Sequence, residues 1–460
     1  MDLGVVGLGV MGENLILNIL DKGYSVGVYN RTVQKTDAFI GKTSHKNAKG
    51  FGSLSSLVQE LKAPRILLLM ITAGSPVDAL LKQLEGLIGS SDIVIDGGNS
   101  NYHDTMRRCT AAEGKYLFVG CGISGGEEGA RYGPSIMPGG SHEAWPAISS
   151  ILQKISAVDE STNEPCCEWI GPSGSGHLVK TVHNGIEYAE MQIIADFYQI
   201  FRGGLSPAEI SGIFGEWMKS GTSGFLIEAV QDILQKKIDG SDCYLIDRVV
   251  DISEQKGTGK WTVLESFDTN TPTPVIVEAV TARVLSSMKE ERVASSKMLP
   301  VGAEDEPSLM GALSVDEMRK GFLLCRALSY IQGFNLIKSI SDANSWSISL
   351  DMLCRVWSNG CIIRSEFLKT LTTISKSTPF FHSSSFIEIA ENGIAPLRKI
   401  VSYCTRQGVS IPCVSSSLTY YDTIRTSKSS GNMIQALRDY FGAHTLLLEG
   451  ESERTHISWK

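Results

Sequence analysis

The chain has 460 residues, 42% of them hydrophobic and 20% charged, a composition that gives a globular protein room for two or three domains. Its net charge of -8 argues against a nucleic-acid ligand, and its apolar stretches are too short to span a membrane, so we expect neither as a partner. The N-terminus lacks the features of an export signal, so we expect a cytoplasmic protein. The 10 cysteines show no paired CxxC spacing, so we expect reduced thiols and no metal site.

Short apolar runs alternate with amphipathic stretches over the first 175 residues. Each run is β-branched or leucine-rich and is followed by glycine or polar residues. The runs lie at Leu3 to Gly7, Val26 to Asn30, Arg65 to Ile71, Asp92 to Asp96 and Leu117 to Gly120. This alternation is typical of buried parallel strands joined by helices, so we expect a doubly wound α/β domain over residues 1–175.

The pattern changes after the glycine-rich segment that ends at Gly176. Long stretches with helical spacing follow, such as Leu178 to Phe201 and Val275 to Met288. We predict a mostly helical domain over residues 176–430, with polar loops near Leu299 to Ser308 and Ser375 to Ser385, and a short C-terminal tail over 431–460.

A glycine-rich turn follows the first strand. Gly7, Gly9 and Gly12 form the pattern GxGxxG directly before the amphipathic segment Asn14 to Leu20. In dinucleotide-binding proteins the first glycine makes the tight turn, the second admits the pyrophosphate and the third lets helix and strand approach. A turn without a ligand would also fit the glycines alone, but the position between strand and helix favours dinucleotide binding.

The second strand ends in Asn30, Arg31 and Thr32, where NAD enzymes usually carry an acidic residue for the ribose 2′-hydroxyl. Arg31 can instead pair with a 2′-phosphate, with Asn30 and Thr32 as neutral donors. The alternative is a solvated arginine at a strand end. The missing acid favours NADP over NAD.

Five polar residues share one face of the predicted helix after Gly176: Lys180, His183, Asn184, Glu187 and Tyr188. At about 100° per residue they cover an arc of roughly 140°. A solvated surface stripe is the alternative, but the glycines at 174 and 176 are expected to let a ligand approach closely. A lysine and a glutamate on adjacent turns could divide acid and base work if the pKa of the lysine is lowered.

Two loops are expected to converge on this face, one from Asp96 to Ser100 and one from Ser124 to Gly129. Other cations are dispersed along the later sequence. Lys256 and Lys260 flank Gly-Thr-Gly, but this segment lacks the glycine and hydroxyl residue of a Walker loop, so an NTPase is not expected. Each cation taken singly is read as an exposed surface charge.

With these motifs the chain resembles the 6-phosphogluconate dehydrogenase family, the decarboxylating enzymes of the pentose phosphate pathway. The matching segments lie along nearly the whole chain: Gly7 to Asn18, Asn30 to Thr32, Asp96 to Ser100, Gly122 to Pro134, Gly176 to Tyr188, Lys256 to Thr262, Cys361 to Arg364 and Arg438 to Thr445. The resemblance implies a Rossmann-like N-terminal domain, a large all-α domain and a C-terminal tail that reaches into the other subunit of a homodimer.

The resemblance also implies a reaction and its residues. 6-Phosphogluconate would be oxidised at C3 by NADP and lose C1 as CO2, giving ribulose 5-phosphate and NADPH. Lys180 would be the general base at the C3 hydroxyl, and Glu187 the acid that protonates C1 of the enediol. Protonated Lys180 could stabilise the enolate oxygen, so no metal is required.

The implied cofactor contacts are Gly7, Leu8, Gly9, Val10, Met11, Gly12, Asn30, Arg31, Thr32, Ile71, Thr72, Ala73 and Asn99. The implied substrate contacts are Asn99, Ser124, Gly125, Gly126, His183, Asn184, Tyr188, Lys256, Arg283, Arg438 and His444, with the last two donated across the dimer interface. Thr72 stands where many family members have lysine, and Ser358 and Asn359 replace a usual Arg-Gly. We expect these departures to affect cofactor affinity and dimer strength.

Two other functions fit part of the pattern. A β-hydroxyacid dehydrogenase for a small unphosphorylated acid would share the glycine loops and the lysine, but would not need Lys256, Arg283, Arg438 and His444. An inactive NADPH-binding sensor would not need Lys180 and Glu187, which are both present.

Overall fold

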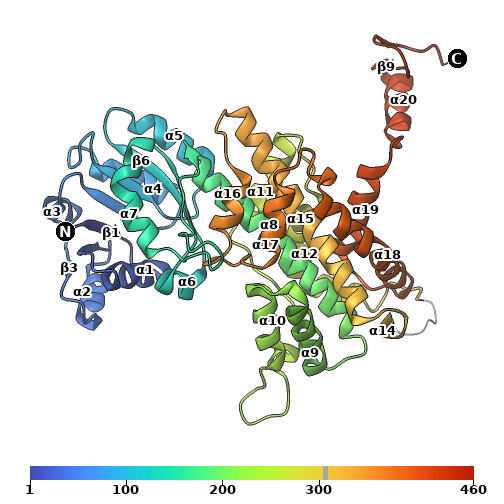
Figure 1. Cartoon of the computed structure of the whole chain (residues 1–460), viewed down its shortest axis with the longest axis horizontal. Coiled ribbons are helices and arrows are strands. Elements are labelled where there is room, and N and C mark those ends of the chain that lie inside the picture. Colours follow the sequence, from blue (N-terminus) through green and yellow to red (C-terminus); the bar gives the residue numbers. More distant parts are fainter. Residues whose placement is uncertain (304–308, 460) are drawn as a thin grey trace.

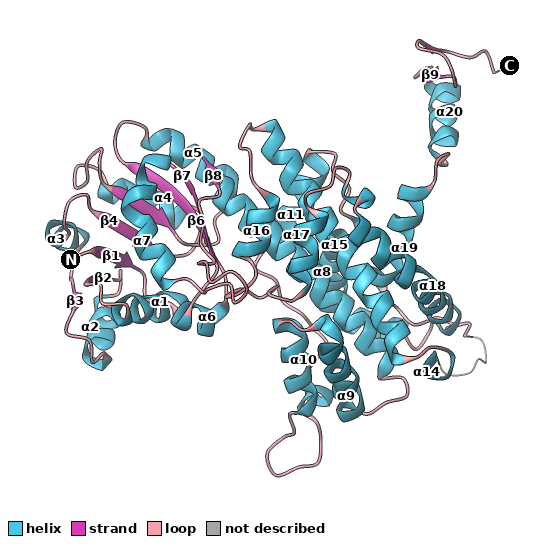
Figure 2. Cartoon of the chain, in the orientation of Figure 1, coloured by secondary structure: helices cyan, strands magenta, loops and turns pink. Residues whose placement is uncertain are grey.

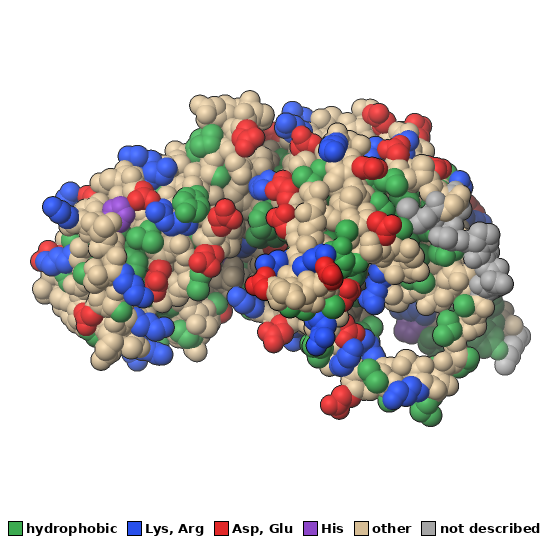
Figure 3. All heavy atoms as spheres, turned by 90° about the horizontal axis from the view of Figure 1, so that it is seen from below, with side chains coloured by type: hydrophobic (Ala, Val, Ile, Leu, Met, Phe, Trp, Pro, Cys, Tyr) green, Lys and Arg blue, Asp and Glu red, His purple; other side chains and the backbone are tan. Residues whose placement is uncertain are grey.

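The computed structural model describes residues 1–303 and 309–459. A sheet domain and a helical domain lie side by side, and the last helix extends away from the helical domain (Figure 1). Acidic and basic side chains are interspersed over the face shown in Figure 3. In the described residues no helix is both long and apolar enough to cross a membrane.

The sheet domain is built on eight strands in the order β3-β2-β1-β4-β5-β6-β7-β8. All neighbouring pairs are parallel except β6 and β7. The strands are β1 (Leu3–Val6), β2 (Val26–Tyr29), β3 (Ala48–Gly50), β4 (Ile66–Leu69), β5 (Ile93–Asp96), β6 (Leu117–Ile123), β7 (Ile136–Gly140) and β8 (Gly171–Pro172).

Helices cover both faces of this sheet (Figure 2). They are α1 (Val10–Asp21), α2 (Val33–Lys42), α3 (Leu54–Glu60), α4 (Ser75–Leu84), α5 (Tyr102–Ala112), α6 (Gly126–Tyr132) and α7 (Trp145–Ile155). Neighbouring strand residues contribute to separate cores: Val5 packs with the apolar sides of α1 and α7, and Val6 with those of α3 and α4. Apolar residues at consecutive strand positions are therefore buried on opposite faces, as in a sheet covered by helices on both sides.

The five strands that the sequence predicts are present, and the fold class is confirmed. These five strands pair in parallel as predicted, and one strand that was not predicted, β7, returns antiparallel to β6 after the short helix α6. The three strands that were not predicted carry weak signals: β3 and β8 have three and two residues, and β7 reads Ile-Met-Pro-Gly-Gly. Proline and glycine are poor strand formers, so neighbouring strands must hold such a segment in the sheet.

The helical domain surrounds two long helices, α8 (Ser175–Phe201) and α15 (Val315–Ala343), which pack against each other within one large apolar core. The other helices are α9 (Pro207–Trp217), α10 (Phe225–Gln235), α11 (Thr258–Asp268), α12 (Pro274–Ser287), α13 (Lys289–Ser295), α14 (Leu309–Ala312), α16 (Leu350–Val356), α17 (Phe367–Ile374), α18 (Ser384–Gln407), α19 (Pro412–Arg425) and α20 (Gly431–Gly442).

The two helices predicted from spacing correspond to α8 and α12. The predicted polar loop near residues 375–385 contains a short 3-10 turn, Phe380–His382, between α17 and α18. The other predicted loop, Leu299 to Ser308, lies outside the described residues from position 304 on. The boundaries at 175 and 430 stay predictions.

The C-terminal arm consists of α20 and a hairpin of β9 (Leu446–Leu447) and β10 (Arg454–Thr455), and it projects from the body (Figure 1). The buried carboxylate of Asp439 holds the arm together, because it accepts hydrogen bonds from His456, the backbone of Ile457 and Trp459. The arm is thus an ordered unit that extends beyond the main core.

Candidate active site

The three glycines after β1 have different neighbours. Gly7 has a φ of +110°, and a Cβ there would lie 2.3 Å from the carbonyl oxygen of Met70. A Cβ on Gly12 would lie 2.4 Å from the carbonyl oxygen of Gly7, whereas one on Gly9 would meet no protein atom within 4 Å. Gly7 and Gly12 are therefore required by the fold, and Gly9 leaves space open in front of the N-terminus of α1.

A cleft of about 440 Å³ opens beside this turn. It is lined by Val6, Gly7, Leu8, Gly9, Tyr29, Asn30, Arg31, Thr32, Lys35, Met70, Ile71, Thr72, Pro76, Ala79, Leu80 and Gln83. Among these described residues Arg31 and Lys35 are cations and none is an acid, which suits a phosphorylated ribose. Lys35 was not among the cofactor residues predicted from the sequence, although its position one turn after Arg31, in the first turn of α2, could have indicated it.

The other predicted cofactor residues lie near the cleft or support it. The Asn30 carboxamide accepts a hydrogen bond from the backbone of Leu8 at 3.1 Å and donates one to the carbonyl oxygen of Thr32 at 3.1 Å, so it joins the glycine turn to the end of β2. Val10 and Met11 begin α1, Ala73 follows the cleft residue Thr72, and Asn99 is exposed in the loop after β5.

The polar stripe on α8 is buried, so the alternative of a solvated surface stripe was wrong. His183 is fully buried, Lys180, Asn184 and Tyr188 are less than a tenth exposed, and the Glu187 side chain is 19% exposed. A Cβ on Gly122 of β6 would lie 2.5 Å from the Cβ of Lys180, so the missing side chain at 122 lets α8 pack directly on the sheet. The stripe therefore lies where the two domains meet.

The glycines before this stripe have a different role from the one predicted. A Cβ on Gly176 would lie 2.4 Å from the carbonyl oxygens of Gly120 and Met137, and one on Gly174 would lie 2.6 Å from that of Tyr102. These positions are filled by the backbone of the sheet domain. The glycines serve close helix–sheet packing, and the prediction that they admit a ligand was wrong.

Hydrogen bonds connect the stripe to both domains. The Lys180 ammonium donates to the carboxamide oxygen of Asn184 at 2.9 Å, and the Asn184 amide nitrogen donates to the Thr258 hydroxyl at 3.1 Å. His183 Nε2 lies 3.3 Å from the Ser124 hydroxyl. Glu187 lies one turn further along, with a carboxylate oxygen 3.8 Å from His183 Nδ1. The two predicted loops do not contribute equally, since Ser124 reaches this cluster and Asn99 stays exposed.

Burial shifts the pKa values of these groups in opposite directions. Desolvation lowers the pKa of Lys180, opposed by the charges of Glu187 and Cys361. Desolvation raises the pKa of Glu187, opposed by Lys180 and Arg283. Burial also holds the pKa of His183 well below its usual range, so this imidazole is neutral. The shifts favour an amine that accepts a proton and a carboxyl group that supplies one.

Further cations lie beyond Glu187. The Arg283 guanidinium stacks on the Tyr188 ring, 3.5 Å from its centroid, and donates to the carbonyl oxygen of Glu254 at 3.3 Å. Lys256 is exposed directly before the N-terminus of α11, whose first residue is Thr258. Thr258 was not among the predicted residues, although it lies inside the segment from Lys256 to Lys260 that the sequence singled out.

Gly125, directly before helix α6, lies against the turn after α16, whereas a Cβ on Gly126, the first residue of α6, would meet no protein atom within 4 Å. A Cβ on Gly125 would lie 2.6 Å from the carbonyl oxygen of Gly360, and the Trp357 ring meets the His183 ring edge-on, 5.6 Å between centroids. The tryptophan gave no functional signal in the sequence, because apolar packing residues look alike there. This turn supports the site from the helical domain.

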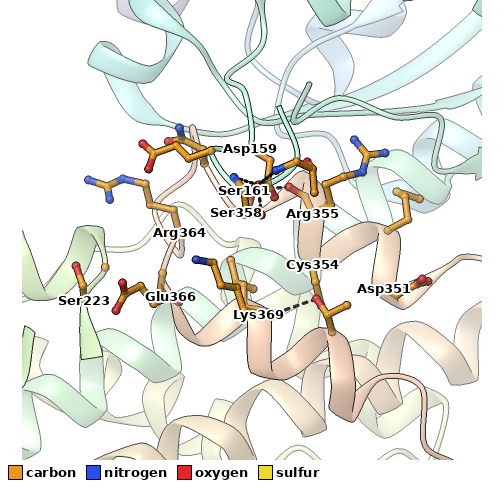
Figure 4. A pocket seen from close by; sticks show the side chains of 18 of the residues that line it. Asp159, Ser161, Ser223, Asp351, Cys354, Arg355, Ser358, Arg364, Glu366 and Lys369 are labelled. Carbon is orange, nitrogen blue, oxygen red and sulfur yellow. Dashed lines mark hydrogen bonds between the residues drawn. The ribbon is translucent and has the colours of Figure 1, made fainter. Parts of the chain in front are cut away.

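A cavity of about 790 Å³ opens where Ser358 and Asn359 follow Trp357. Asp159 and Ser161 lie on its sheet-domain side, and Glu366 and Lys369 on the helical side (Figure 4). The two residues that depart from the family pattern line this cavity. The Asn359 amide donates to the carbonyl oxygen of Val158 at 3.0 Å, so it helps to join the domains.

Arg438 and His444 are not brought to the site within this chain. Arg438 is exposed on α20 and donates to Gln435 at 3.1 Å, and His444 is exposed just beyond that helix, against the ring of Phe441. Both therefore lie on the arm that projects from the body. In the part of the chain that is described, no group of three or more His, Cys, Asp or Glu side chains is placed to hold a metal ion.

The glycine turn, the cleft beside it and the buried lysine where the domains meet define a dinucleotide-dependent oxidoreductase with a Rossmann-like domain. The family model "NAD binding domain of 6-phosphogluconate dehydrogenase" matches residues 2–171, and "6-phosphogluconate dehydrogenase, C-terminal domain" matches residues 176–459. The chain belongs to the 6-phosphogluconate dehydrogenase family, as the sequence motifs predicted.

Individual relatives match over the full length. The chain is 42% identical to "6-phosphogluconate dehydrogenase, decarboxylating 1" of Saccharomyces cerevisiae, with 100% of this chain and 96% of the relative covered. It is 44% identical to the decarboxylating enzyme of Aggregatibacter actinomycetemcomitans over 96% of this chain and 93% of that one. The solved Plasmodium falciparum 6-phosphogluconate dehydrogenase superposes with a TM-score of 0.94 at 37% identity, with both chains fully covered.

Proposed function

We propose that this chain oxidises and decarboxylates 6-phosphogluconate to ribulose 5-phosphate and CO2 while reducing NADP. The observation that carries the proposal is the pair on α8, in which the buried amine of Lys180 has a lowered pKa and the carboxyl group of Glu187 a raised one. The Plasmodium falciparum relative has been solved with NADP+ and with 6-phosphogluconate, which supports the choice of cofactor and substrate.

The residues around the cleft fit NADP. The open space at Gly9 would take the pyrophosphate at the N-terminus of α1, where no side chain caps the helix. Arg31 and Lys35 would hold the 2′-phosphate. When bound, NADP supplies an acceptor for the hydride that leaves C3 of the substrate.

Lys180 would act first, as a base. Its neutral amine takes the proton of the C3 hydroxyl while the hydride leaves the same carbon, so C3 becomes a ketone. That ketone lies β to the carboxylate, and it accepts the electron pair released when the bond from C1 to C2 breaks and CO2 leaves. The ammonium group formed on Lys180 stabilises the resulting enolate oxygen and returns its proton there, giving the enediol.

Glu187 would act last, as an acid. Its protonated carboxyl group donates a proton to the carbon that becomes C1 of the product, while the neutral amine of Lys180 takes the hydroxyl proton from the neighbouring carbon, so the enediol becomes ribulose 5-phosphate. The lowered pKa of His183 keeps this imidazole neutral, so it serves as a hydrogen-bonding group beside Ser124 and adds no charge. Ser124, Gly125, Gly126, Asn99 and Asn184 would hold the sugar acid.

The phosphate end of the substrate would be held by Tyr188, Lys256 and Arg283, together with Arg438 and His444 of a second subunit. Support comes from α20, where Met433, Ile434, Leu437, Tyr440 and Phe441 are each more than half exposed. Their spacing makes one apolar stripe, which an isolated chain would leave in water. A homodimer in which the arms are exchanged would cover this stripe and bring the two cations to the partner's site.

The reaction is tested by assaying NADPH and CO2 together. With 6-phosphogluconate and NADP, the purified protein should form both products in equal amounts. 3-Hydroxyisobutyrate, which has no phosphate, should give a much lower rate. NADPH formation without CO2, or faster turnover of 3-hydroxyisobutyrate, would refute the proposal.

The exchange of arms is tested with hybrid dimers of Lys180→Met and Arg438→Ala. One site of the hybrid then lacks both groups, while the other has a native Lys180 and receives a native Arg438 from the neighbouring chain. Mixing the two weakly active variants should restore about a quarter of native activity at random pairing, since half of the dimers carry one complete site. A mixture no more active than its components would contradict donation between subunits.

A further inference from the structure

A buried glutamate outside the proposed catalytic residues joins the two domains. Glu265 lies in the last turns of α11 and is 6% exposed. One of its carboxylate oxygens accepts a hydrogen bond from the Tyr102 hydroxyl at 2.6 Å, and the other lies 2.8 Å from His103 Nε2. Both partners begin α5 of the sheet domain, so a single carboxylate connects helices that are about 160 residues apart in sequence.

The sheet-domain end of this contact is next to the cofactor loop. Asn101, two residues after Asn99, caps α5 by accepting a hydrogen bond from the backbone of His103 at 2.9 Å. The Tyr102 ring stacks against the His103 ring and meets Trp346 of the helical domain edge-on, 6.2 Å between centroids. The start of α5, and with it the loop that carries Asn99, is therefore held from the helical side.

The other end is next to the proposed phosphate site. Thr258, Thr262 and Glu265 are spaced four and three residues apart, so they share one face of α11. Thr258 accepts from Asn184, and the Thr262 hydroxyl donates to the carbonyl oxygen of Thr181 at 2.8 Å. This face therefore contacts α8 twice, at Thr181 and Asn184 just after Lys180, and it contacts α5 through Glu265.

We propose that Glu265 is a positioning residue that fixes the Asn99 loop relative to Lys180 and the N-terminus of α11. The cofactor cleft belongs to the sheet domain and the phosphate cations to the helical domain, so hydride transfer requires one fixed distance between them. Glu265 sets this distance through Tyr102 and His103 without touching either ligand. Only the kinetic test of this inference, which uses 6-phosphogluconate, rests on the proposed function.

The kinetic test compares Glu265→Ala with Glu265→Gln, Tyr102→Phe and the control Asp268→Ala, which removes an exposed carboxylate one turn further along α11. Glu265→Ala should lower kcat by about tenfold or more and raise the isotope effect with 6-phosphogluconate deuterated at C3, while KM for NADP changes by less than about twofold. Glu265→Gln, whose amide oxygen still accepts from Tyr102, should keep most of the rate, and Asp268→Ala should match the native protein.

Combining the substitutions tests whether Tyr102 and Glu265 act together. Tyr102→Phe should cost little further rate in the Glu265→Ala background, because the contact is already lost. Additive losses, or equal changes in kcat and in KM for both ligands, would show that Glu265 only stabilises the fold, and the proposal would fall.

Hydrogen exchange tests the positioning role of Glu265 even if 6-phosphogluconate is not the substrate. Binding of NADPH should slow amide exchange in α11 of the native protein. In Glu265→Ala, NADPH should still bind but exchange in α11 should no longer respond. A native protein without this response, or a variant that keeps it, would overturn the role of Glu265, whereas absence of turnover with 6-phosphogluconate would overturn only the proposed reaction.

Discussion

The two ligand regions of this molecule are built in different ways. The cofactor cleft lies within one domain of one chain, with Gly9 leaving space and a helix N-terminus behind it. The region on α8 depends on side chains whose pKa values are shifted by burial, and the cations proposed for it lie on several elements, including an arm that leaves the body. The first can form within a single folded domain, whereas the second requires the packing of two domains.

The largest effect is expected where chemistry depends on a single buried side chain. Lys180→Met keeps the length of the side chain but removes the amine, so kcat should fall by about 10³-fold or more while NADPH binds as in the native protein. Rates are measured by NADPH absorbance and binding by NADPH fluorescence. Native rates in this variant would exclude Lys180 as the base.

Glu187→Gln should change the pH dependence as well as the rate. The active form needs a neutral Lys180 and a protonated Glu187, so kcat/KM should rise as the lysine loses its proton and fall as the glutamate does. Because the pKa of Glu187 is raised, that fall begins above the usual range of a carboxyl group. In Glu187→Gln the rate should be about 10²-fold lower, and the fall of kcat/KM on the high-pH side of the optimum should disappear. If the fall persists, another group causes it.

Arg31→Ala tests cofactor choice in the cleft. Loss of a charge-assisted hydrogen bond to the 2′-phosphate should weaken NADP binding by about 10- to 100-fold and leave NAD binding nearly unchanged. The measurement is kcat/KM for both cofactors, with Lys35→Ala as a second cation on the same cleft. A proportional loss for NAD and NADP would mean that Arg31 does not recognise the phosphate.

Gly9→Ala separates the ligand role of the turn from its structural role. A methyl group at position 9 meets no protein atom, so the melting temperature should stay nearly constant while the Kd for NADPH rises by about tenfold. Gly7→Ala is the contrasting variant, because its Cβ would collide with the backbone of Met70 and its φ is positive. It should lose stability even without cofactor. Equal behaviour of the two variants would contradict the assignment.

The smallest effect concerns stability in the helical domain. Burial raises the pKa of Asp196 on α8 to about 7, although its carboxylate accepts hydrogen bonds from Gln192 and Val414. A group whose pKa is raised by folding contributes fully to the stability of the folded state when the pH lies below the pKa that the group has in the unfolded chain. For Asp196 this contribution is lost as the pH rises through about 7. The slope is at most about 1.4 kcal/mol per pH unit.

Asp196→Asn removes this titration but keeps an oxygen acceptor. Thermal unfolding at pH 5 and pH 8 should show a smaller drop in midpoint for the variant than for the native protein. Asp268→Asn, an exposed carboxyl group on α11, is the matched control and should leave the difference unchanged. A native midpoint that does not fall between these pH values would refute the raised pKa.

The sequence predicts the cofactor region better than the substrate region, for a physical reason. Alternating strands and the glycine turn are local patterns, so the motif at Gly7 and the fold class could be read directly. The burial of Lys180 depends on Gly122, 58 residues earlier, and on the turn at Trp357, which no local spacing reveals. For the same reason Gly174 and Gly176 were assigned to a ligand, whereas Gly174 in fact packs against α5 and Gly176 against the sheet.

The roles of single residues depended on the family resemblance. Spacing placed Lys180 and Glu187 on one face of a helix but could not assign base and acid, and Arg283 taken alone looked like any exposed charge. Thr258 and Glu265 were missed because each acts through a contact with an element that is distant in the sequence, whereas Lys35 had a local signal in its place one turn after Arg31. The resemblance identifies residues that belong to the family's motifs. The structure identifies further residues whose roles follow from their contacts in the folded chain.

If the arms are exchanged between two chains as proposed, activity depends on the protein concentration. Under the proposed exchange, a chain released from its partner loses Arg438 and His444 from its own site and the apolar stripe of α20 loses its cover. Turnover per subunit would then decline on dilution below the dissociation constant of the dimer, and 6-phosphogluconate, by bridging two chains, would oppose that decline by mass action. Substrate supply would in this way regulate the assembly that consumes it.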